Sequence, residues 1–193
     1  MRYPNGKKFE ETPTVVTKHH DTSRRGMTLE NDINRSNSHY LSEHVANIHK
    51  KPTPVTIVNV SYPSRNKAKI TEAYFKIPST TDYNGIYRSR YIDFEAKECK
   101  SRTAFPFSSI HKHQIEHLKD VMMHGAIAFV IIRMNYYDTD YLIKAEDLIS
   151  YYNETERRSL PYDWIKEKGH VIKRSYLIPV DYIKVIDEVY FRR

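Results

Sequence analysis

The apolar residues of this chain recur at two spacings, and each spacing predicts a different kind of element. After Thr28 they return every three or four positions, so we expect a helix over residues 29–43 with Thr28 as its N-cap. The same helical spacing recurs in residues 109–124, 145–152 and 181–190. Gly125 follows the first of these three segments, and we expect that helix to end near it.

Other stretches are extended in character, because they are rich in β-branched and aromatic residues. We expect strands at residues 45–48, 55–62, 68–77, 91–98 and 140–143. Residues 126–134 are almost wholly apolar, which indicates a central strand that is covered on both faces. Together the elements predict an α/β or α+β fold in which a mixed central sheet is flanked by helices.

The strands at residues 55–62 and 68–77 are predicted to form a basic hairpin that projects from this fold. Pro52 and Pro54 precede it and cannot continue a regular ladder, so the chain changes direction there. Three of its basic residues can meet DNA phosphates: Arg65, Lys67 and Lys69. For Tyr74 and the adjacent Phe75 two alternatives stay open, because such rings either turn into a core or stack on unpaired bases.

A second hairpin carries most of the polar residues of interest. Asn84-Gly85 is a turn signal, so we expect it to connect the segment with Thr80 and Asp82 to the strand at residues 91–98. Side chains alternate between the two sides of a strand. One side is expected to pack on the core and carries Ile92, Phe94 and Ala96. The other side carries Tyr91, Asp93, Glu95 and Lys97.

Charge and composition favour a soluble protein with a nucleic-acid partner. The chain has 31 basic against 24 acidic residues, a net charge of +7 and a pI near 9.3. Its one cysteine excludes an internal disulfide, and no apolar run is long enough to span a membrane. We therefore expect a cytoplasmic protein with one domain over residues 26–193, a hairpin inserted at about 55–77, and a flexible basic arm over residues 1–25.

Asp82, Glu95 and Lys97 are the residues whose spacing predicts chemistry. Glu95 and Lys97 leave one side of a strand, and Asp82 can reach the same spot across the hairpin. Two carboxylates suit a hard cation such as Mg²⁺. The ammonium can then orient the attacking water or stabilise charge on a phosphate, which predicts hydrolysis of DNA phosphodiesters. The alternative is a solvated strand face with one surface ion pair.

Several longer strings give these residues a context. They are residues 78–85 (PSTTDYNG), 91–98 (YIDFEAKE), 25–30 (RGMTLE), 49–54 (HKKPTP) and 113–117 (HQIEH). The chain resembles the RecU family of Holliday junction resolvases, within the PD-(D/E)xK nuclease superfamily. The resemblance runs from residue 2 to about residue 132 and is looser in residues 181–191. After Asn135, and around residues 157–170, the chain departs from the family pattern.

This resemblance implies a restriction-endonuclease-like core with a protruding β stalk that enters the open centre of a DNA junction. It implies a homodimer that nicks two strands of a four-way junction symmetrically. It also implies a Mg²⁺ ion, with Mn²⁺ as a substitute, that is held at four positions: Thr80, Asp82, Glu95 and Gln114. Lys97 then stabilises the transition state. Taken alone, Gln114 reads as a solvent-facing amide and Thr80 as an ordinary strand residue.

Other residues are expected to support the site or to bind DNA. Asp93 lies one step of the pleat, about 7 Å, from Glu95, so we expect it to make a salt bridge or to support a metal ligand rather than to bind the metal itself. Glu30 either orients a ligand or Lys97, or is simply exposed. The DNA-binding candidates are Arg24, Arg25, Arg65, Lys67, Lys69 and Phe75. A zinc site at the three histidines of residues 111–117 is rejected, because they lack the H-E-x-x-H arrangement.

The leading functional hypothesis is a Mg²⁺-dependent endonuclease that resolves four-way DNA junctions in recombination and repair. A second hypothesis is a DNA-structure binding protein that anneals strands or modulates a recombinase. A third is a restriction-type enzyme, which would cut linear DNA at a fixed sequence. A recombinase or a branch-migration protein is a further partner that the first hypothesis allows.

Overall fold

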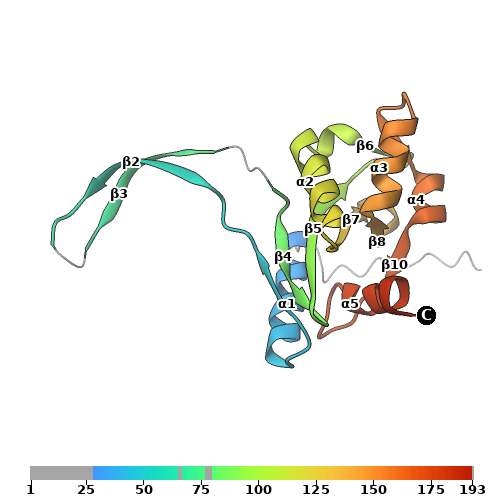
Figure 1. The fold of residues 1–193 in the computed structure, drawn as a ribbon, viewed down its shortest axis with the longest axis horizontal. Helices are drawn as coiled ribbons and strands as arrows, with labels where there is room; N and C mark the ends of the chain where they lie inside the picture. The colour runs from blue at the N-terminus through green and yellow to red at the C-terminus, as the bar shows by residue number, and fades with distance from the viewer. Residues whose placement is uncertain (1–27, 65–66, 77–79, 193) are drawn as a thin grey trace, which may run out of the picture.

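The computed structural model describes residues 28–64, 67–76 and 80–192. It has a six-stranded sheet with helices on both faces and a long hairpin that projects to one side (Figure 1). The strand order is β1-β4-β5-β7-β8-β10; β5 and β7 are parallel, and all other neighbours are antiparallel. The strands are Asn47–Lys50 (β1), Tyr83–Tyr87 (β4), Arg90–Cys99 (β5), Ile127–Met134 (β7), Thr139–Lys144 (β8) and His170–Ile172 (β10). The predicted mixed sheet is confirmed.

One face of the sheet is covered by helices α1 (Leu29–Ser42) and α5 (Tyr182–Ile186). Thr28 caps α1 as predicted, because its Oγ1 accepts a hydrogen bond from Asn31 N at 3.3 Å. Beneath the helices, the ring of Phe94 stacks between two further rings, with centroids 4.8 Å from Tyr83 and 4.7 Å from Phe129. The predicted C-terminal helix is confirmed, but its second half, Asp187–Phe191, is π-helical.

The other face carries α2 (Lys112–Met123), α3 (Ala145–Glu154) and α4 (Tyr162–Lys168). Helix α2 begins three residues later than predicted, because Phe107–Ser109 form a 3₁₀ turn and His111 is extended. Gly125 ends the α2 segment with a positive φ of 85°, as predicted. Two short strands pair beside these helices, β6 (Ala104–Pro106) and β9 (Ser159–Pro161). No helix in the described part of the chain is long and apolar enough to cross a membrane.

Asn84-Gly85 does not form the predicted turn, because both residues lie within β4. The turn falls later, at Arg88 and Ser89, whose φ angles are 48° and 61°. A glycine is needed at position 85 for a steric reason, because a Cβ there would lie 2.1 Å from the carbonyl oxygen of Asn47. The glycine therefore allows β1 to approach β4 closely. Strand β1 itself begins two residues later than predicted.

The projecting hairpin, called the stalk hairpin here, consists of β2 (Val55–Ser61) and β3 (Lys69–Phe75). It confirms the predicted projection and stands clear of the sheet (Figure 1). Neither of its faces is covered: Tyr74 is 61% exposed and Phe75 is 84% exposed. The alternative that these rings turn into a core is therefore wrong. At its base, Lys76 N donates to the carbonyl oxygen of Pro54 at 3.0 Å.

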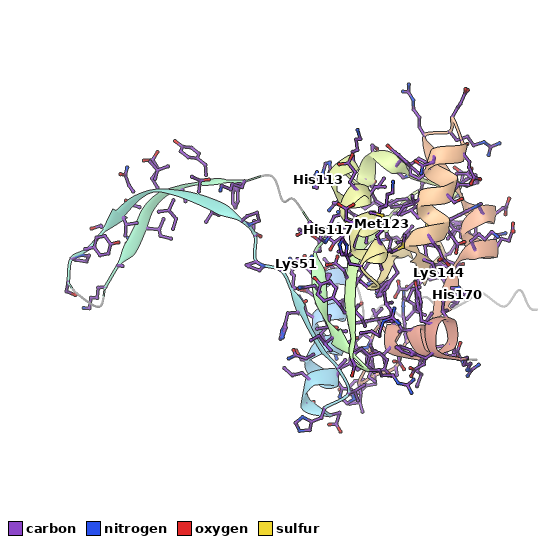
Figure 2. All side chains as sticks on the ribbon, in the orientation of Figure 1. Lys51, His113, His117, Met123, Lys144 and His170 are labelled. Atoms are coloured by element: carbon purple, nitrogen blue, oxygen red, sulfur yellow. The ribbon has the colours of Figure 1, made fainter. Side chains whose placement is uncertain are left out.

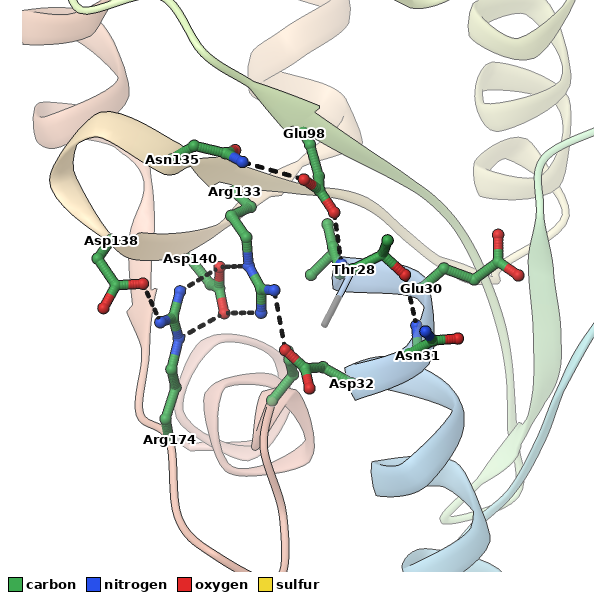
Figure 3. Close-up of polar contacts among 12 residues, drawn as sticks. Thr28, Glu30, Asn31, Asp32, Glu98, Arg133, Asn135, Asp138, Asp140 and Arg174 are labelled. Atoms are coloured by element: carbon green, nitrogen blue, oxygen red, sulfur yellow. Dashed lines mark hydrogen bonds and ion pairs between the residues drawn. The ribbon is translucent and has the colours of Figure 1, made fainter. Parts of the chain in front are cut away.

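A buried ion network fastens α1 to the sheet (Figure 3). The guanidinium of Arg133 lies 2.8 Å from an Asp32 oxygen and 2.7 Å from an Asp140 oxygen. Burial alone would raise the pKa of Asp140, but hydrogen bonds from Arg133 and Arg174 outweigh it and lower the pKa. Close by, the carboxylate of Glu98 accepts from the first amide of α1 at 2.5 Å. These contacts fix the start of α1 against the end of β5.

Candidate active site

Glu95 lies at the centre of the site that the structure brings together. Its side chain is wholly buried, and it projects from β5 toward α2 rather than toward the aromatic core. One carboxylate oxygen accepts a hydrogen bond from Asp82 N at 3.1 Å. The other lies 2.5 Å from Nζ of Lys97, whose side chain is 25% exposed. The three predicted residues are therefore neighbours, and the alternative of a solvated strand face is wrong.

Burial and charge perturb the Glu95 carboxyl strongly. Loss of hydration is the largest cause that raises its pKa, the neighbouring Asp82 carboxyl raises it as well, and Lys97 lowers it; together they bring the pKa to about 8. Its Oε1 atom is buried and contacts the ammonium of Lys97. An acidic group that is buried among polar neighbours and held this far from its usual pKa is typical of functional sites.

The oxygen atoms present fit a hard divalent cation. The described residues hold no cluster of three or more His, Cys, Asp or Glu side chains that could bind a metal. A cation here would therefore bind two carboxylates, Asp82 and Glu95, together with neutral oxygens and water, which is the coordination Mg²⁺ accepts. A carboxylate has about four lone-pair sites, so Glu95 can bind such a cation while its Oε1 contacts Lys97.

Gln114 is not the solvent-facing amide that its sequence context suggests, because it is only 4% exposed. It occupies the first turn of α2, where its Oε1 accepts a hydrogen bond from His111 N at 2.9 Å. A carbonyl-type oxygen has a second lone pair, so this bond leaves Gln114 able to bind a cation. Thr80 is half-buried, and its hydroxyl donates to the carbonyl oxygen of Thr81 at 3.3 Å.

Asp93 is the centre of a second buried cluster on the same side of β5. Its carboxylate accepts from Lys51 Nζ at 2.8 Å and Tyr91 Oη at 3.0 Å, and lies 3.2 Å from His117 Nε2. The hydroxyl of Thr81, next to Asp82, donates to it as well. The predicted salt bridge of Asp93 is thus confirmed. Figure 2 shows Lys51 at the base of the stalk hairpin and His117 on α2.

Comparison with known proteins decides the family. The sequence pattern of the family described as Recombination protein U matches residues 24–188, which is most of the chain. The chain belongs to the RecU family. This confirms the resemblance carried by the strings around Asp82 and Glu95, and it extends the match through the C-terminal half, where the strings had departed from the pattern.

Individual relatives agree with this assignment along the whole chain. A "Holliday junction resolvase RecU" from Bacillus cereus (strain G9842) is 48% identical and covers 99% of this chain and 98% of its own length. A protein of the same name from Bacillus mycoides (strain KBAB4) is 47% identical with the same coverage. A third, from Bacillus anthracis (strain A0248), is also 47% identical.

The remaining candidates in this RecU family chain lie outside the buried site. Glu30 forms an ion pair with Lys50 at 2.6 Å, and its side chain is 52% exposed. Lys67 and Lys69 are exposed on the stalk hairpin. Three further candidates, Arg24, Arg25 and Arg65, lie outside the described residues.

Sequence reasoning missed Lys51 and Thr81, and it gave His117 only a general place on a polar helix face. Their shared feature is contact with Asp93, which lies 42 residues from Lys51 and 24 residues from His117 along the chain. No local spacing could reveal a contact between such distant residues. The one available signal was Asp93 itself, because the salt bridge expected of it requires a cationic partner.

Proposed function

We propose that this chain is a Holliday junction resolvase, a structure-selective endonuclease that cuts two strands of a four-way DNA junction in recombination and repair. The observation that carries the proposal is the buried contact of Glu95 with Asp82 and Lys97. It stands within a chain whose full-length relatives bear the name Holliday junction resolvase. Hydrolysis of a phosphodiester needs this combination of anionic oxygens and a cation beside the scissile phosphate.

The residues divide into those that would hold a metal and those that act on the phosphate. Asp82, Glu95, Thr80 and Gln114 would hold Mg²⁺ or Mn²⁺, which when bound acidifies water and polarises a phosphoryl oxygen. Lys97 keeps its ammonium 2.5 Å from Glu95 and partly exposed, so it can donate to a phosphate oxygen on which charge develops.

Asp93 is assigned a positioning role in this proposal. It holds Lys51 on one side and His117 on the other, and through Thr81 it fixes the segment that carries Asp82. Lys51 keeps 19% of its side chain exposed, so its charge can still attract an incoming DNA backbone.

The stalk hairpin supports selection of branched DNA. It presents exposed aromatic and basic side chains on a ribbon with no covering layer, and Phe75 and Tyr74 offer open ring faces. Unstacked bases at a branch point can stack on such rings, whereas paired bases within a duplex cannot. Selection would then follow from the shape of the DNA more than from base sequence.

We further propose that two copies act together, because each protomer holds one cutting site and resolution needs two nicks. A two-stranded hairpin is only marginally stable by itself in water, so packing against a second copy would stabilise the stalk hairpin. Its half-exposed apolar residues support such a contact: Val55, Ile57, Val58 and Ile70. Sedimentation equilibrium of the free chain tests this, and a monomer at micromolar concentration would contradict it.

A cleavage assay tests the main proposal. A labelled synthetic four-way junction and a linear duplex of the same sequence are incubated with the chain, with and without Mg²⁺. We expect paired nicks in the junction only when Mg²⁺ is present. Glu95→Gln and Lys97→Ala, made separately, should each abolish nicking while junction binding stays measurable. Undiminished cutting by either variant would refute the assignment.

The second candidate, a DNA-structure binding protein that anneals strands or modulates a recombinase, is favoured by the exposed stalk hairpin alone. Deleting residues 55–75 discriminates, and two glycines can close the gap because Pro54 and Lys76 are already hydrogen bonded. A junction resolvase should lose its preference for four-way DNA. An enzyme of the restriction type should keep cutting linear duplex at a fixed site, and a purely binding protein should cut neither substrate before or after the deletion.

A further inference from the structure

A basic pocket lies beside the candidate active site. It has a volume of about 850 Å³ and lies between the start of α2, the 3₁₀ turn before it, the end of α3 and the approach to β9. Three of its lining residues carry a permanent positive charge: Lys112, Arg157 and Arg158. His111 lines it too, and none of the residues that line it is acidic.

The two arginines of this pocket are not occupied elsewhere. Within residues 28–64, 67–76 and 80–192, neither guanidinium makes an ion pair or a side-chain hydrogen bond, whereas Arg133 and Arg174 make several. Lys112 has only an exposed contact of 3.6 Å with Glu116, which is weak. Unpaired guanidiniums that gather in a hollow provide the fork of donors that phosphate oxygens match.

Hydrogen bonds of the backbone fix the segment that carries the two arginines. The ring of Phe107 packs edge-on against Tyr152 with centroids 5.1 Å apart. The amide of Phe107 donates to the carbonyl oxygen of Arg158 at 3.0 Å, and Arg157 N donates to the hydroxyl of Thr155 at 3.1 Å. The backbone that carries both arginines is therefore tied to the 3₁₀ turn and to the end of α3.

The pocket shares a residue with the candidate active site. His111 lines the pocket, and its amide is the group that holds the side chain of Gln114. His111 and Gln114 are separated by about one turn of helix, which rises about 5.4 Å. A DNA strand advances about 3.4 Å per nucleotide. A strand that places its scissile phosphate at Glu95 and Gln114 would thus bring a phosphate to the pocket within a few nucleotides.

We propose that this pocket binds a backbone phosphate of the DNA strand a few nucleotides from the cut, through Arg157, Arg158 and Lys112. The proposal rests on the proposed function, because the same strand must occupy the active site. It would fix the direction and register of that strand, since phosphate contacts position a nucleic acid without reading its sequence.

The first test measures binding without cutting. Arg157→Gln and Arg158→Gln are introduced together into the Glu95→Gln background, and junction affinity is measured from 50 to 300 mM salt. We expect about tenfold weaker binding, and a salt dependence shallower by about 0.9 for each phosphate that the variant no longer neutralises. The matched control is Lys166→Gln with Lys168→Gln, which removes the same charge from α4, outside the pocket. The control should keep the parent slope.

The second test locates the phosphate that the pocket binds. Single methylphosphonate linkages, which lack the phosphate charge, are placed at successive positions on either side of the cut. The parent should lose affinity at one flanking position, and the arginine double variant should lose nothing more there, because the two changes remove the same interaction. Equal losses in both proteins, or an unchanged affinity and salt slope, would overturn the pocket proposal and leave the pocket to a partner such as an acidic peptide.

The failures are distinguishable. If the unmodified chain neither binds nor cuts four-way junctions, the proposed function fails and the pocket proposal fails with it. If the unmodified chain cuts junctions with Mg²⁺ but the two arginine changes leave binding unaltered in the Glu95→Gln background and cutting unaltered in the unmodified background, only the pocket proposal is overturned. Urea unfolding of the double variant should match the parent, because both arginine side chains are exposed.

Discussion

Two regions of this molecule depart, in opposite directions, from the usual pattern of apolar residues inside and charged residues outside. On β5, Asp93 and Glu95 are charged or chargeable residues with no exposed surface. On the stalk hairpin, Phe75 and Tyr74 are large aromatic residues with most of their surface in water. Buried carboxylates and exposed aromatic rings each oppose stability. Local departures from these rules are expected at functional sites, so both regions are the ones in which we test for function.

The two regions differ in how firmly they are held. Asp93 has four partners, and three of them come from segments outside its own strand, so its position is fixed by contacts across the fold. The stalk hairpin has contacts almost only between its own two strands, and register shifts interrupt their pairing after Ile57 and Asn59. We therefore expect substitutions at the site to change the free energy of unfolding, and substitutions on the stalk hairpin to leave it unchanged.

The largest change in the free energy of unfolding is expected from Asp93→Ala. It leaves Lys51, which is only 19% exposed, without its partner, and it also removes the acceptor of Thr81 and His117. Breaking a buried ion pair typically costs 3–5 kcal/mol, and the partial exposure of Lys51 places this case at about 3 kcal/mol. Urea denaturation measures the change in the free energy of unfolding.

The control for Asp93→Ala is Glu30→Ala, which breaks the Glu30–Lys50 ion pair at the surface. An exposed pair contributes no more than about 1 kcal/mol. If the two variants lost equal stability, the expectation that the buried ion pair contributes more to stability than the exposed one would be wrong.

The second expected effect is a dependence of thermal stability on pH that comes from Glu95. The folded pKa of about 8 lies above the unfolded value of 4.5, so the folded state binds the proton more tightly. The resulting stabilisation is complete below about pH 4.5 and is lost as the pH rises toward 8. Gln cannot titrate, so Glu95→Gln should lack this loss. In EDTA, the Tm of the variant relative to the unmodified chain should rise by a few degrees between pH 5 and pH 8.

Thermal unfolding at four pH values tests this without any DNA. A suitable control is Glu43→Gln, because Glu43 is exposed at the end of α1 and its side chain makes no hydrogen bond or ion pair within the described residues. The difference in Tm from the unmodified chain should change with pH more for Glu95→Gln than for this control. Parallel curves for Glu95→Gln and the unmodified chain would show that burial does not perturb this carboxyl.

The sequence predicted the parts of the fold that repeat over many residues. Helix α1 and strand β7 were found because their apolar spacing continues for fourteen and eight residues. The strands β6, β9 and β10 were missed because three residues are too few to show a period. Asn84-Gly85 misled because a glycine that admits a neighbouring backbone looks the same in sequence as one that forms a turn.

The candidate site was predictable only in part, for a similar reason. Glu95 and Lys97 lie two residues apart on one strand, so their contact follows from the strand period. The partners of Asp93 come from distant segments, and the fold alone brings them together. The depth of burial was also invisible, because a polar residue on a strand reads as solvent-facing until the helix that covers it is placed.

The smallest effect on stability, and the sharpest contrast with the site, is expected from Phe75→Ala. Because the ring is 84% exposed, its loss should change the free energy of unfolding by less than about 0.5 kcal/mol. Binding to a four-way junction should nonetheless weaken about tenfold, since a base that stacks on an aromatic ring gains about 1–3 kcal/mol. Fluorescence anisotropy with a labelled junction measures the affinity. Tyr176→Ala is the control, because Tyr176 is 88% exposed but lies outside the stalk hairpin. Equal loss of affinity in both variants would mean that exposure alone matters, whereas a loss confined to Phe75→Ala would show that the stalk hairpin uses its exposed rings to hold DNA.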